Sequence, residues 1–329
     1  MASTVNSAFN EFMKNTVNLE NQKVEKARRS RDFLKGKISN FSDFLPLYSD
    51  RNIDYGSFAR KTKIRELDDI DMIFTLKANG CTWTEGYDGT VYLETPQFSD
   101  DYKNFRHSES LNLNSKKIIN KFISSLKSIP HYTKADIHRN MQSVSFMLDS
   151  YDWNFDIVPA FMTTEDLLGK SYYLIPDGYG NWMKTDPRID RARVKTINQN
   201  HNGKILDVIR ITKYWQRRAT MPSMSSYLLE SIILEYYENN SSSNFLDMNF
   251  RNLLNYLSHR IYNSVNDPKG IQGEINTLSL EEKTKISNKA INDIKIADIA
   301  NNFELIDGDH ENAIKEWKKI FGSNFPDCG

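Results

Sequence analysis

Cysteine and long apolar runs are nearly missing from this sequence of 329 residues. Cys81 and Cys328 are its only cysteines and lie far apart, so neither a disulfide framework nor a four-cysteine zinc site can form. No run of about 18 apolar residues is present, which argues against a membrane span. The N-terminal stretch MASTVNSAFNEFMKN also lacks the apolar centre of a signal peptide. We therefore expect a cytoplasmic protein without membrane contact.

An excess of charge of either sign is missing too. Lysine and arginine together number 43, as do aspartate and glutamate. Proteins whose whole surface binds DNA or RNA usually carry a clear basic excess, so this class is disfavoured. A basic segment from Lys23 to Lys37 is interrupted by Glu25 and Asp32; we interpret it as a solvated helix face, with a local nucleic-acid contact as the alternative. The histidines show no paired metal-ligand spacing and are assigned structural or surface roles: His107, His131, His138, His201, His259 and His310.

Apolar residues make up 39% of the sequence, enough for one large or two medium domains. Residues 7–37 have a helical pattern. Strand-like runs begin at Ile70, Val91, Ser143 and Asn154, and a helical segment near 115–126 separates them. This order predicts an α/β core with a mixed sheet and helices on one side.

The pattern changes after Pro159. The stretch YYLIPDGYGNWMKTDPR is predicted to be a loop, and the last residues, FPDCG, are predicted to be a frayed tail. We expect two domains, residues 1–165 with the sheet and the N-terminal helix, and residues 166–329 as a helical bundle. The helical patterns of the second domain cover residues 203–218, 226–237, 245–262, 279–300 and 310–321.

Three aspartates stand out by their place in apolar runs. In LDDIDMIFTL, Asp69 and Asp71 are two residues apart, and such residues point to the same face of a strand, whereas Asp68 has the other phase. In NFDIVP, Asp156 is the acid of an otherwise apolar strand. Close carboxylates repel one another and raise each other's pKa unless cations neutralise them. The pattern therefore predicts bound Mg²⁺ or Mn²⁺, which prefer oxygen ligands.

A Gly-Ser pair, Gly56 and Ser57 in YGSFAR, precedes the acidic pair. Glycine lets the backbone approach a ligand closely, and N–H groups and a serine hydroxyl at the start of a helix bind phosphate oxygens. Two metal ions about 4 Å apart hold both the attacking and the leaving oxygens of a phosphoryl displacement. Together these motifs predict a site for a nucleoside triphosphate and its metals, with chance surface acids as the alternative.

The Gly-Ser, the DxD and the third aspartate on a neighbouring strand resemble the motifs of the DNA polymerase β-like nucleotidyltransferase superfamily. The stretch VIRITKYWQRRATMPSMSSYLLESIILEYY resembles the bacterial CD-NTases, relatives of cyclic GMP-AMP synthase and oligoadenylate synthase, which have a helix bearing a lysine before a SYxLE-like helix start. The resemblance covers roughly residues 50 to 240. It implies a polymerase β-like core packed on a C-terminal helical domain that completes the nucleotide-binding cleft.

The resemblance also implies roles for single residues. An ammonium suits phosphate, and an aromatic ring stacks on any base. For Lys213 a solvent-exposed lysine is the alternative, and for Tyr227 a core aromatic. The implied site comprises Gly56 and Ser57 on the donor phosphates, the catalytic Asp69, Asp71 and Asp156 on two Mg²⁺ or Mn²⁺ ions, Lys213 and Ser226 on the triphosphate, and Tyr227 on the donor base.

The activity implied by the resemblance is the joining of NTPs (ATP, GTP, with UTP or CTP as further candidates) into a cyclic di- or trinucleotide second messenger. Asp156 is also a candidate acceptor of the hydroxyl proton. The resemblance further implies CBASS anti-phage defence, with an effector protein that responds to the product and with accessory proteins. Two distant cysteines cannot build the zinc thumb with which animal cyclic GMP-AMP synthase senses DNA, so we expect no stable DNA binding.

Two alternatives stay open. One is an enzyme of the same fold that transfers a nucleotide to tRNA, to a protein or to a small molecule. The other is a non-catalytic relative that binds nucleotide or RNA. The choice of bases, the linkage and the ring size are not predicted.

Overall fold

The structure, a computed structural model, describes residues 2–42, 44–219 and 221–329. The chain divides into a sheet unit, Asn21–Arg60 and Leu67–Arg188, and a helical unit, which holds the residues up to Glu20, Lys61–Glu66 and Ile189–Gly329. This division differs from the predicted boundary at residue 165. The N-terminal stretch belongs to the helical unit, where the Phe9 ring packs edge to face on Trp317 with the ring centroids 4.9 Å apart.

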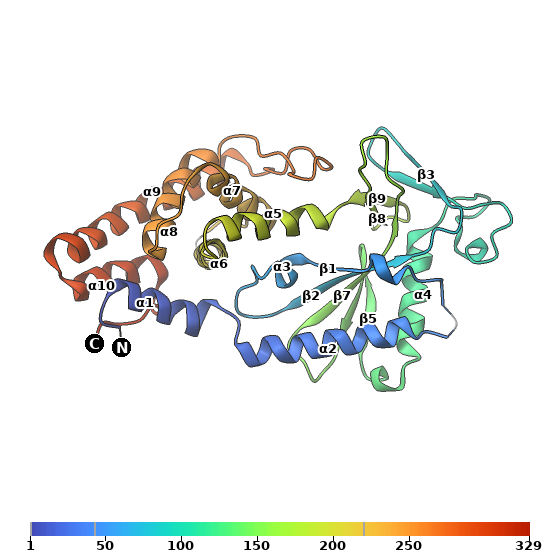
Figure 1. The fold of residues 1–329 in the computed structure, drawn as a ribbon, viewed down its shortest axis with the longest axis horizontal. Coiled ribbons are helices and arrows are strands. Elements are labelled where there is room, and N and C mark those ends of the chain that lie inside the picture. The colour runs from blue at the N-terminus through green and yellow to red at the C-terminus, as the bar shows by residue number, and fades with distance from the viewer. Residues whose placement is uncertain (1, 43, 220) are drawn as a thin grey trace. The chain divides into compact units, whose positions relative to one another are not determined.

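The sheet unit contains one mixed sheet. In the described part of the chain its strands run in the order β1-β2-β7-β8-β9-β4-β3, and β6 pairs with both β7 and β5 (Figure 1). The pair β2 and β7 is parallel, and the other neighbouring strands are antiparallel. The bounds are β1 Ile53–Tyr55, β2 Asp69–Leu76, β3 Thr82–Glu85, β4 Val91–Glu94, β5 Asp136–Asn140, β6 Ser143–Met147, β7 Asn154–Met162, β8 Tyr173–Pro176 and β9 Trp182–Thr185.

The first half of β2 and of β7 has one apolar and one polar face. Ile70 and Met72 are buried, and Phe74 packs against Phe122 of α4 (Ser115–Lys127). On the other face, Asp71 and Asp156 are only half-buried. The alternation arises because successive side chains of a strand point to opposite faces. The sheet unit also holds the long helix α2 (Asn21–Ser39). The predicted α/β class, with helices and a mixed sheet, is confirmed.

The segment predicted to be a loop, residues 172–188, is in fact a hairpin of β8 and β9 followed by the start of a helix. The turn is held by Asp177, whose carboxylate accepts hydrogen bonds from the backbone N–H groups of Tyr179, Gly180 and Asn181. The helix α5 (Pro187–Asn200) begins with proline, whose missing N–H costs nothing at the first helical position. The turn residues dominate the sequence pattern here, so the two short strands on either side of the turn were not predicted.

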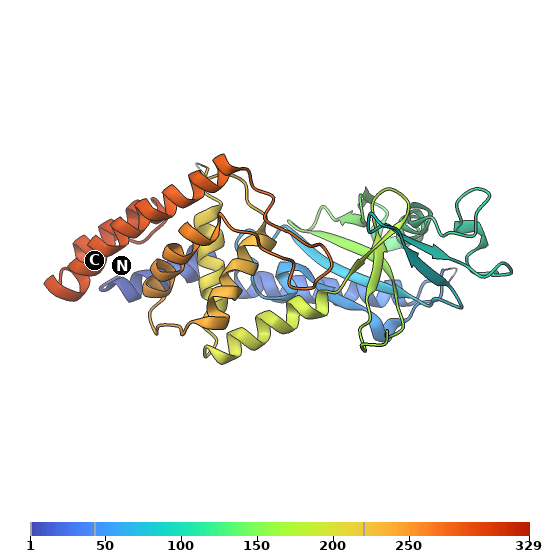
Figure 2. The same cartoon turned by 90° about the horizontal axis from the view of Figure 1, so that it is seen from above.

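The helical unit has one buried apolar core, which includes Trp215, Phe250 and Trp317. In Figure 2, α9 and α10 form the red helical hairpin at one end of this unit. All the helices predicted after residue 200 are present. The helices of this unit are α1 Val5–Phe12, a π-helical turn Met13–Val17, α5 Pro187–Asn200, α6 Ile205–Gln216, α7 Ser226–Asn239, α8 Leu246–Arg260, α9 Leu280–Asn302, a π-helical turn Phe303–Asp307 and α10 His310–Phe321.

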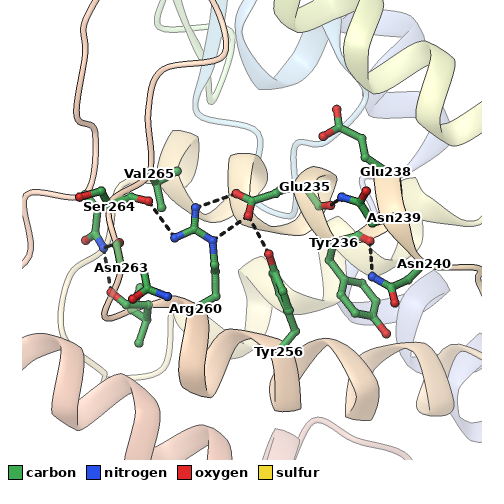
Figure 3. Close-up of polar contacts among 12 residues, drawn as sticks. Glu235, Tyr236, Glu238, Asn239, Asn240, Tyr256, Arg260, Asn263, Ser264 and Val265 are labelled. Atoms are coloured by element: carbon green, nitrogen blue, oxygen red, sulfur yellow. Dashed lines mark hydrogen bonds and ion pairs between the residues drawn. The ribbon is translucent and has the colours of Figure 1, made fainter.

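A charged network joins α7 to α8 (Figure 3). Arg260 donates from Nε and Nη2 to the two carboxylate oxygens of Glu235, at 2.7 and 2.9 Å, and the Tyr256 hydroxyl donates to Glu235 at 2.7 Å. Burial alone would raise the pKa of Glu235, but the hydrogen bonds from Arg260 and Tyr256 outweigh burial and lower it. The two helices are therefore fixed by a bidentate pair as well as by apolar packing.

The C-terminal residues pack on the helical unit, so the prediction of a frayed tail was wrong. The Phe325 ring is buried and lies 5.3 Å from that of Phe9, centroid to centroid. The backbone N–H of Gly329 donates to the carbonyl of Ala2 at 3.2 Å. Aromatic burial outweighs the glycine and proline signals of this segment. No helix in the described part of the chain is long and apolar enough to cross a membrane.

Candidate functional site

The parallel pairing of β2 with β7 brings the three predicted aspartates together. Asp71 lies directly opposite Asp156 in the register, and Asp69 lies opposite Asn154. Residues opposite each other on neighbouring strands share a face, with Cβ atoms roughly 5 Å apart. Asp69 is two residues from Asp71 and shares that face as well. The expectation of one carboxylate cluster from two distant sequence motifs therefore agrees with the register.

Gly56 places the Gly-Ser turn directly against this cluster. It opens the short helix α3 (Gly56–Ala59) after β1, with φ +70°, a left-handed conformation that favours glycine. A Cβ atom added to Gly56 would lie 1.7 Å from Oδ2 of Asp71. Only glycine fits here, because both its backbone angle and its contact with Asp71 exclude a side chain. Ser57 follows as a half-buried residue of the same turn.

The carboxylates change the ionisation of side chains in the site. Burial and then the Asp69 carboxylate raise the pKa of Asp156, although hydrogen bonds from Ser145 and Ser143 lower it in part. The pKa of Tyr55 is raised well above its usual value by burial and by the nearby Asp71, Asp156 and Asp69. Like charges that raise one another's pKa favour a bound cation, since a cation stabilises the charged form.

Sequence reasoning missed Tyr55, Ser143 and Ser145. Tyr55 lies opposite Asp71 on β1, and Ser145 lies opposite Asp156 on β6. The signals were present, because Tyr55 immediately precedes the Gly-Ser pair, and the two serines alternate with the apolar Val144 and Phe146. They could not be assigned without the pairing of the strands.

The donor set of the three aspartates suits a hard divalent cation, since it consists of oxygen atoms alone. In residues 2–42, 44–219 and 221–329, no group of three or more His, Cys, Asp or Glu side chains is already gathered around one metal position. Joint ligation therefore requires rotation of aspartate side chains, which leaves the backbone register unchanged.

Lys213 on α6 is buried, with only 4% of its surface exposed, so the alternative of a solvent-exposed lysine was wrong. Its ammonium forms an ion pair with the buried carboxylate of Glu230 on α7 and donates to the carbonyl of Thr62 at 3.1 Å. The Thr62 hydroxyl also donates to Glu230, at 3.0 Å. A buried charge is normally paired in this way.

Ser226 is exposed and begins α7 as predicted, although the capping hydroxyl belongs to Ser225, which accepts from the Tyr227 N–H. The Tyr227 hydroxyl lies 2.6 Å from the Asp267 carboxylate and accepts from Lys269 Nζ at 2.6 Å. The Lys269 ammonium lies 4.0 Å from the centre of the half-buried Tyr227 ring. Burial, the hydrogen bond to Asp267 and the nearby Asp190 carboxylate raise the pKa of Tyr227.

The eight predicted residues thus form two sets. Five, at positions 56, 57, 69, 71 and 156, lie together in the sheet unit. Three lie in the helical unit, where the Lys213 partner Glu230 is one helical turn beyond Ser226 and Tyr227 on α7.

The chain is similar to known proteins along its whole length. A family model described as the Second Messenger Oligonucleotide or Dinucleotide Synthetase domain matches residues 3–95. A probable cyclic nucleotide synthase of Bacillus cereus (strain VD146) is 45% identical over 331 residues, covering 99% of each chain. The chain of E. coli MS115-1 CdnC in a complex with HORMA-deltaN has a TM-score of 0.68 at 18% identity, covering 98% of both chains.

A second solved structure has a similar fold. Vibrio cholerae DncV cyclic AMP-GMP synthase, in complex with the linear intermediate 5′ pppA(3′,5′)pG, has a TM-score of 0.67 at 12% identity and covers 99% of this chain and 97% of its own. The two solved structures show similarity of fold, whereas the Bacillus cereus protein is similar in sequence as well. Since that alignment covers 99% of the chain at 45% identity, the chain belongs to the bacterial CD-NTase family of nucleotidyltransferases.

Proposed function

We propose that this enzyme is a metal-dependent synthase that joins NTPs into a cyclic di- or trinucleotide second messenger and releases pyrophosphate. One observation carries this proposal: Gly56 lies directly against Asp71, and Asp71 lies opposite Asp156. The phosphate-binding motif and the carboxylates are therefore adjacent, as a reaction at the α-phosphate of a nucleotide requires.

In this proposal Asp69, Asp71 and Asp156 hold two Mg²⁺ or Mn²⁺ ions. Such ions, when bound, neutralise the pyrophosphate and lower the pKa of the attacking hydroxyl. Gly56 and Ser57 hold the donor phosphates with backbone N–H groups and a hydroxyl. Asp156 is the candidate acceptor of the hydroxyl proton, because it lies opposite Asp71 on the carboxylate face, beside the place proposed for the metal that binds the acceptor.

The helical unit contributes Lys213, Ser226 and Tyr227 to nucleotide binding. Ser226 offers an exposed hydroxyl at the start of α7. Lys213, which is paired with Glu230, would donate another N–H of its ammonium to the triphosphate, and Tyr227 would stack through the ring face that Lys269 does not cover. These roles rest on the matching motif and on the chemistry of the side chains.

The similar proteins support a proposal for the biological setting. One is named as a probable cyclic nucleotide synthase, and another was captured with a linear dinucleotide intermediate, which supports bond formation in two or more rounds. A third forms a complex with a HORMA protein, which supports accessory partners. We place the enzyme in the cytoplasm, in CBASS anti-phage defence, where its product activates a separate effector.

The test is product identification. The protein is incubated with the four NTPs, each labelled in turn, and with Mg²⁺ or Mn²⁺; the mixture is treated with phosphatase and analysed by mass spectrometry. A phosphatase-resistant cyclic product supports the proposal and identifies the bases. A label transferred to an added tRNA or protein instead would show a different acceptor, and NTP binding without turnover would show a non-catalytic binder.

A further inference from the structure

A row of side chains extends beyond the carboxylates across five strands. The strand pairings place Tyr55 opposite Asp71, Asp71 opposite Asp156, Asp156 opposite Ser145, and Ser145 opposite His138. Because residues opposite each other share a face, all five side chains belong to the polar face of the sheet. The row therefore continues from the carboxylates on to the hairpin of β5 and β6.

The two flanks of Asp156 in this row differ in chemistry. On one flank are Asp71 and the Gly-Ser turn, which the proposed function assigns to the donor phosphates. On the other flank is Ser145, which is buried and hydrogen-bonds to Asp156. Beyond it lies His138, whose side chain is 54% exposed. An attacking nucleotide must reach Asp156 without displacing the donor, so we assign it to the flank of Ser145, where the exposed His138 can meet it.

His138 is oriented by a carboxylate. Its Nδ1 lies 3.2 Å from the Asp136 carboxylate, two residues earlier on β5 and on the same face. A ring held through Nδ1 presents Nε2 outward, as in other carboxylate–histidine pairs.

We infer that His138, oriented by Asp136, binds the acceptor nucleotide of the synthase reaction, with its Nε2 hydrogen-bonded to the sugar or base. This inference rests on the proposed function. The nucleoside part is the better ligand than the phosphates, because Asp136, Asp156 and Asp69 all lie on this face and repel an anion. His138 positions the acceptor and takes no part in the bonds that form and break.

The test compares His138→Ala with a matched control, Arg139→Ala. Arg139 is the next residue on β5, exposed like His138 but on the other face of the strand. Pyrophosphate release is measured against the concentration of the NTPs found in the product. We expect the half-saturating concentration to rise about tenfold in His138→Ala, the loss of one good hydrogen bond. We expect at most a twofold change in Arg139→Ala and partial rescue by His138→Gln.

A second measurement separates acceptor from donor binding. Calorimetry with an α,β-methylene NTP analogue in Mg²⁺ reports the tight donor site, and its affinity should change less than twofold in His138→Ala. A tenfold loss of that donor affinity would overturn the inference, as would an unchanged half-saturating concentration in an active enzyme. Wild-type protein that binds the analogue but releases no pyrophosphate from any NTP would instead overturn the proposed function and the inference with it.

Discussion

The sheet unit and the helical unit hold their predicted site residues in opposite ways. In the sheet unit, strand register gathers acids, and burial together with the Asp69 carboxylate raises the pKa of Asp156 and disfavours its charged form. In the helical unit, the Lys213 charge and the Tyr227 hydroxyl each have partners of complementary chemistry in their own unit. The first arrangement disfavours the charged form of Asp156, which a bound cation would stabilise, whereas the second gives each polar group a partner within its own unit. Function and stability are therefore expected to separate between the two units.

The largest expected effect is in the sheet unit. We expect Asp69→Asn/Asp71→Asn to lower kcat by about 10³-fold or more, since the site loses negative groups that we propose hold the metals. Asp68→Asn is the matched control, because it changes the same kind of side chain next to Asp69 but in the other phase of the strand. Steady-state pyrophosphate release measures both. An active double variant, or an equally inactive Asp68→Asn, would contradict the metal assignment.

The next effect belongs to the helical unit. Lys213→Met leaves the buried Glu230 carboxylate unpaired and should lower the free energy of unfolding of this unit by about 3–5 kcal/mol. Chemical denaturation monitored by tryptophan fluorescence measures the loss. The double variant Lys213→Met/Glu230→Gln should recover most of it, since glutamine can still accept from Thr62.

Nucleotide affinity then decides the role of Lys213. If Lys213 also contacts the triphosphate, the stable double variant still shows a raised KM for NTP. If the double variant has wild-type stability and wild-type KM, the role of Lys213 in the wild type is limited to its ion pair with Glu230, and it does not belong to the nucleotide site.

Gly56 tests how tightly the two motifs of the sheet unit are joined. In Gly56→Ala the new Cβ would clash with Asp71, and we expect a loss of stability of about 1–3 kcal/mol together with loss of activity. Gly89 is the control, because it also has a positive φ, +80°, but no atom within 4 Å of an added Cβ. Thermal unfolding and turnover of both variants separate backbone strain from the contact. Equal loss of activity in Gly89→Ala would refute the contact as the cause.

The smallest effect is a pH dependence in the helical unit. Burial alone would raise the pKa of Asp267, but hydrogen bonds from Tyr227 and from the backbone N–H groups of Gln272 and Lys269 outweigh burial and lower it to about 2. A depressed folded-state pKa contributes stability above the ordinary aspartate pKa, and this stability is lost as the pH falls towards 2. We expect Asp267→Asn to reduce the loss of unfolding free energy between pH 5 and 2 by about 1–2 kcal/mol. An unchanged profile between pH 5 and 2 would contradict the pairing.

The placement of the three aspartates on one face of the sheet could be predicted from the sequence because short local patterns determine it. The spacing of Asp69 and Asp71 fixes a common face without further information, and the apolar neighbours of Asp156 identify its strand. The long helices of the second half were predicted for the same reason, since a periodic apolar pattern determines them.

What the sequence could not show depends on pairing between distant segments. Tyr55, Ser145 and His138 join the row only because β1, β5 and β6 align with β2 and β7. The burial of Lys213 likewise depends on Glu230 and on Thr62, a residue about 150 positions earlier in the chain. The placement of residues 1–20 in the helical unit also follows from long-range packing, here that of Phe9 on Trp317. No local pattern encodes these partners.

The central claim is that the carboxylate face of the sheet unit acts through divalent metal. The most direct measurement is the rate of pyrophosphate release from the NTPs of the product, after chelation, as a function of added free Mg²⁺ or Mn²⁺, for the wild type, Asp69→Asn/Asp71→Asn and Asp68→Asn. The account predicts no release without metal, restoration by metal in the wild type and in Asp68→Asn, and none at any concentration in the double variant. Release that persists after chelation, or that metal restores equally in all three proteins, would contradict it.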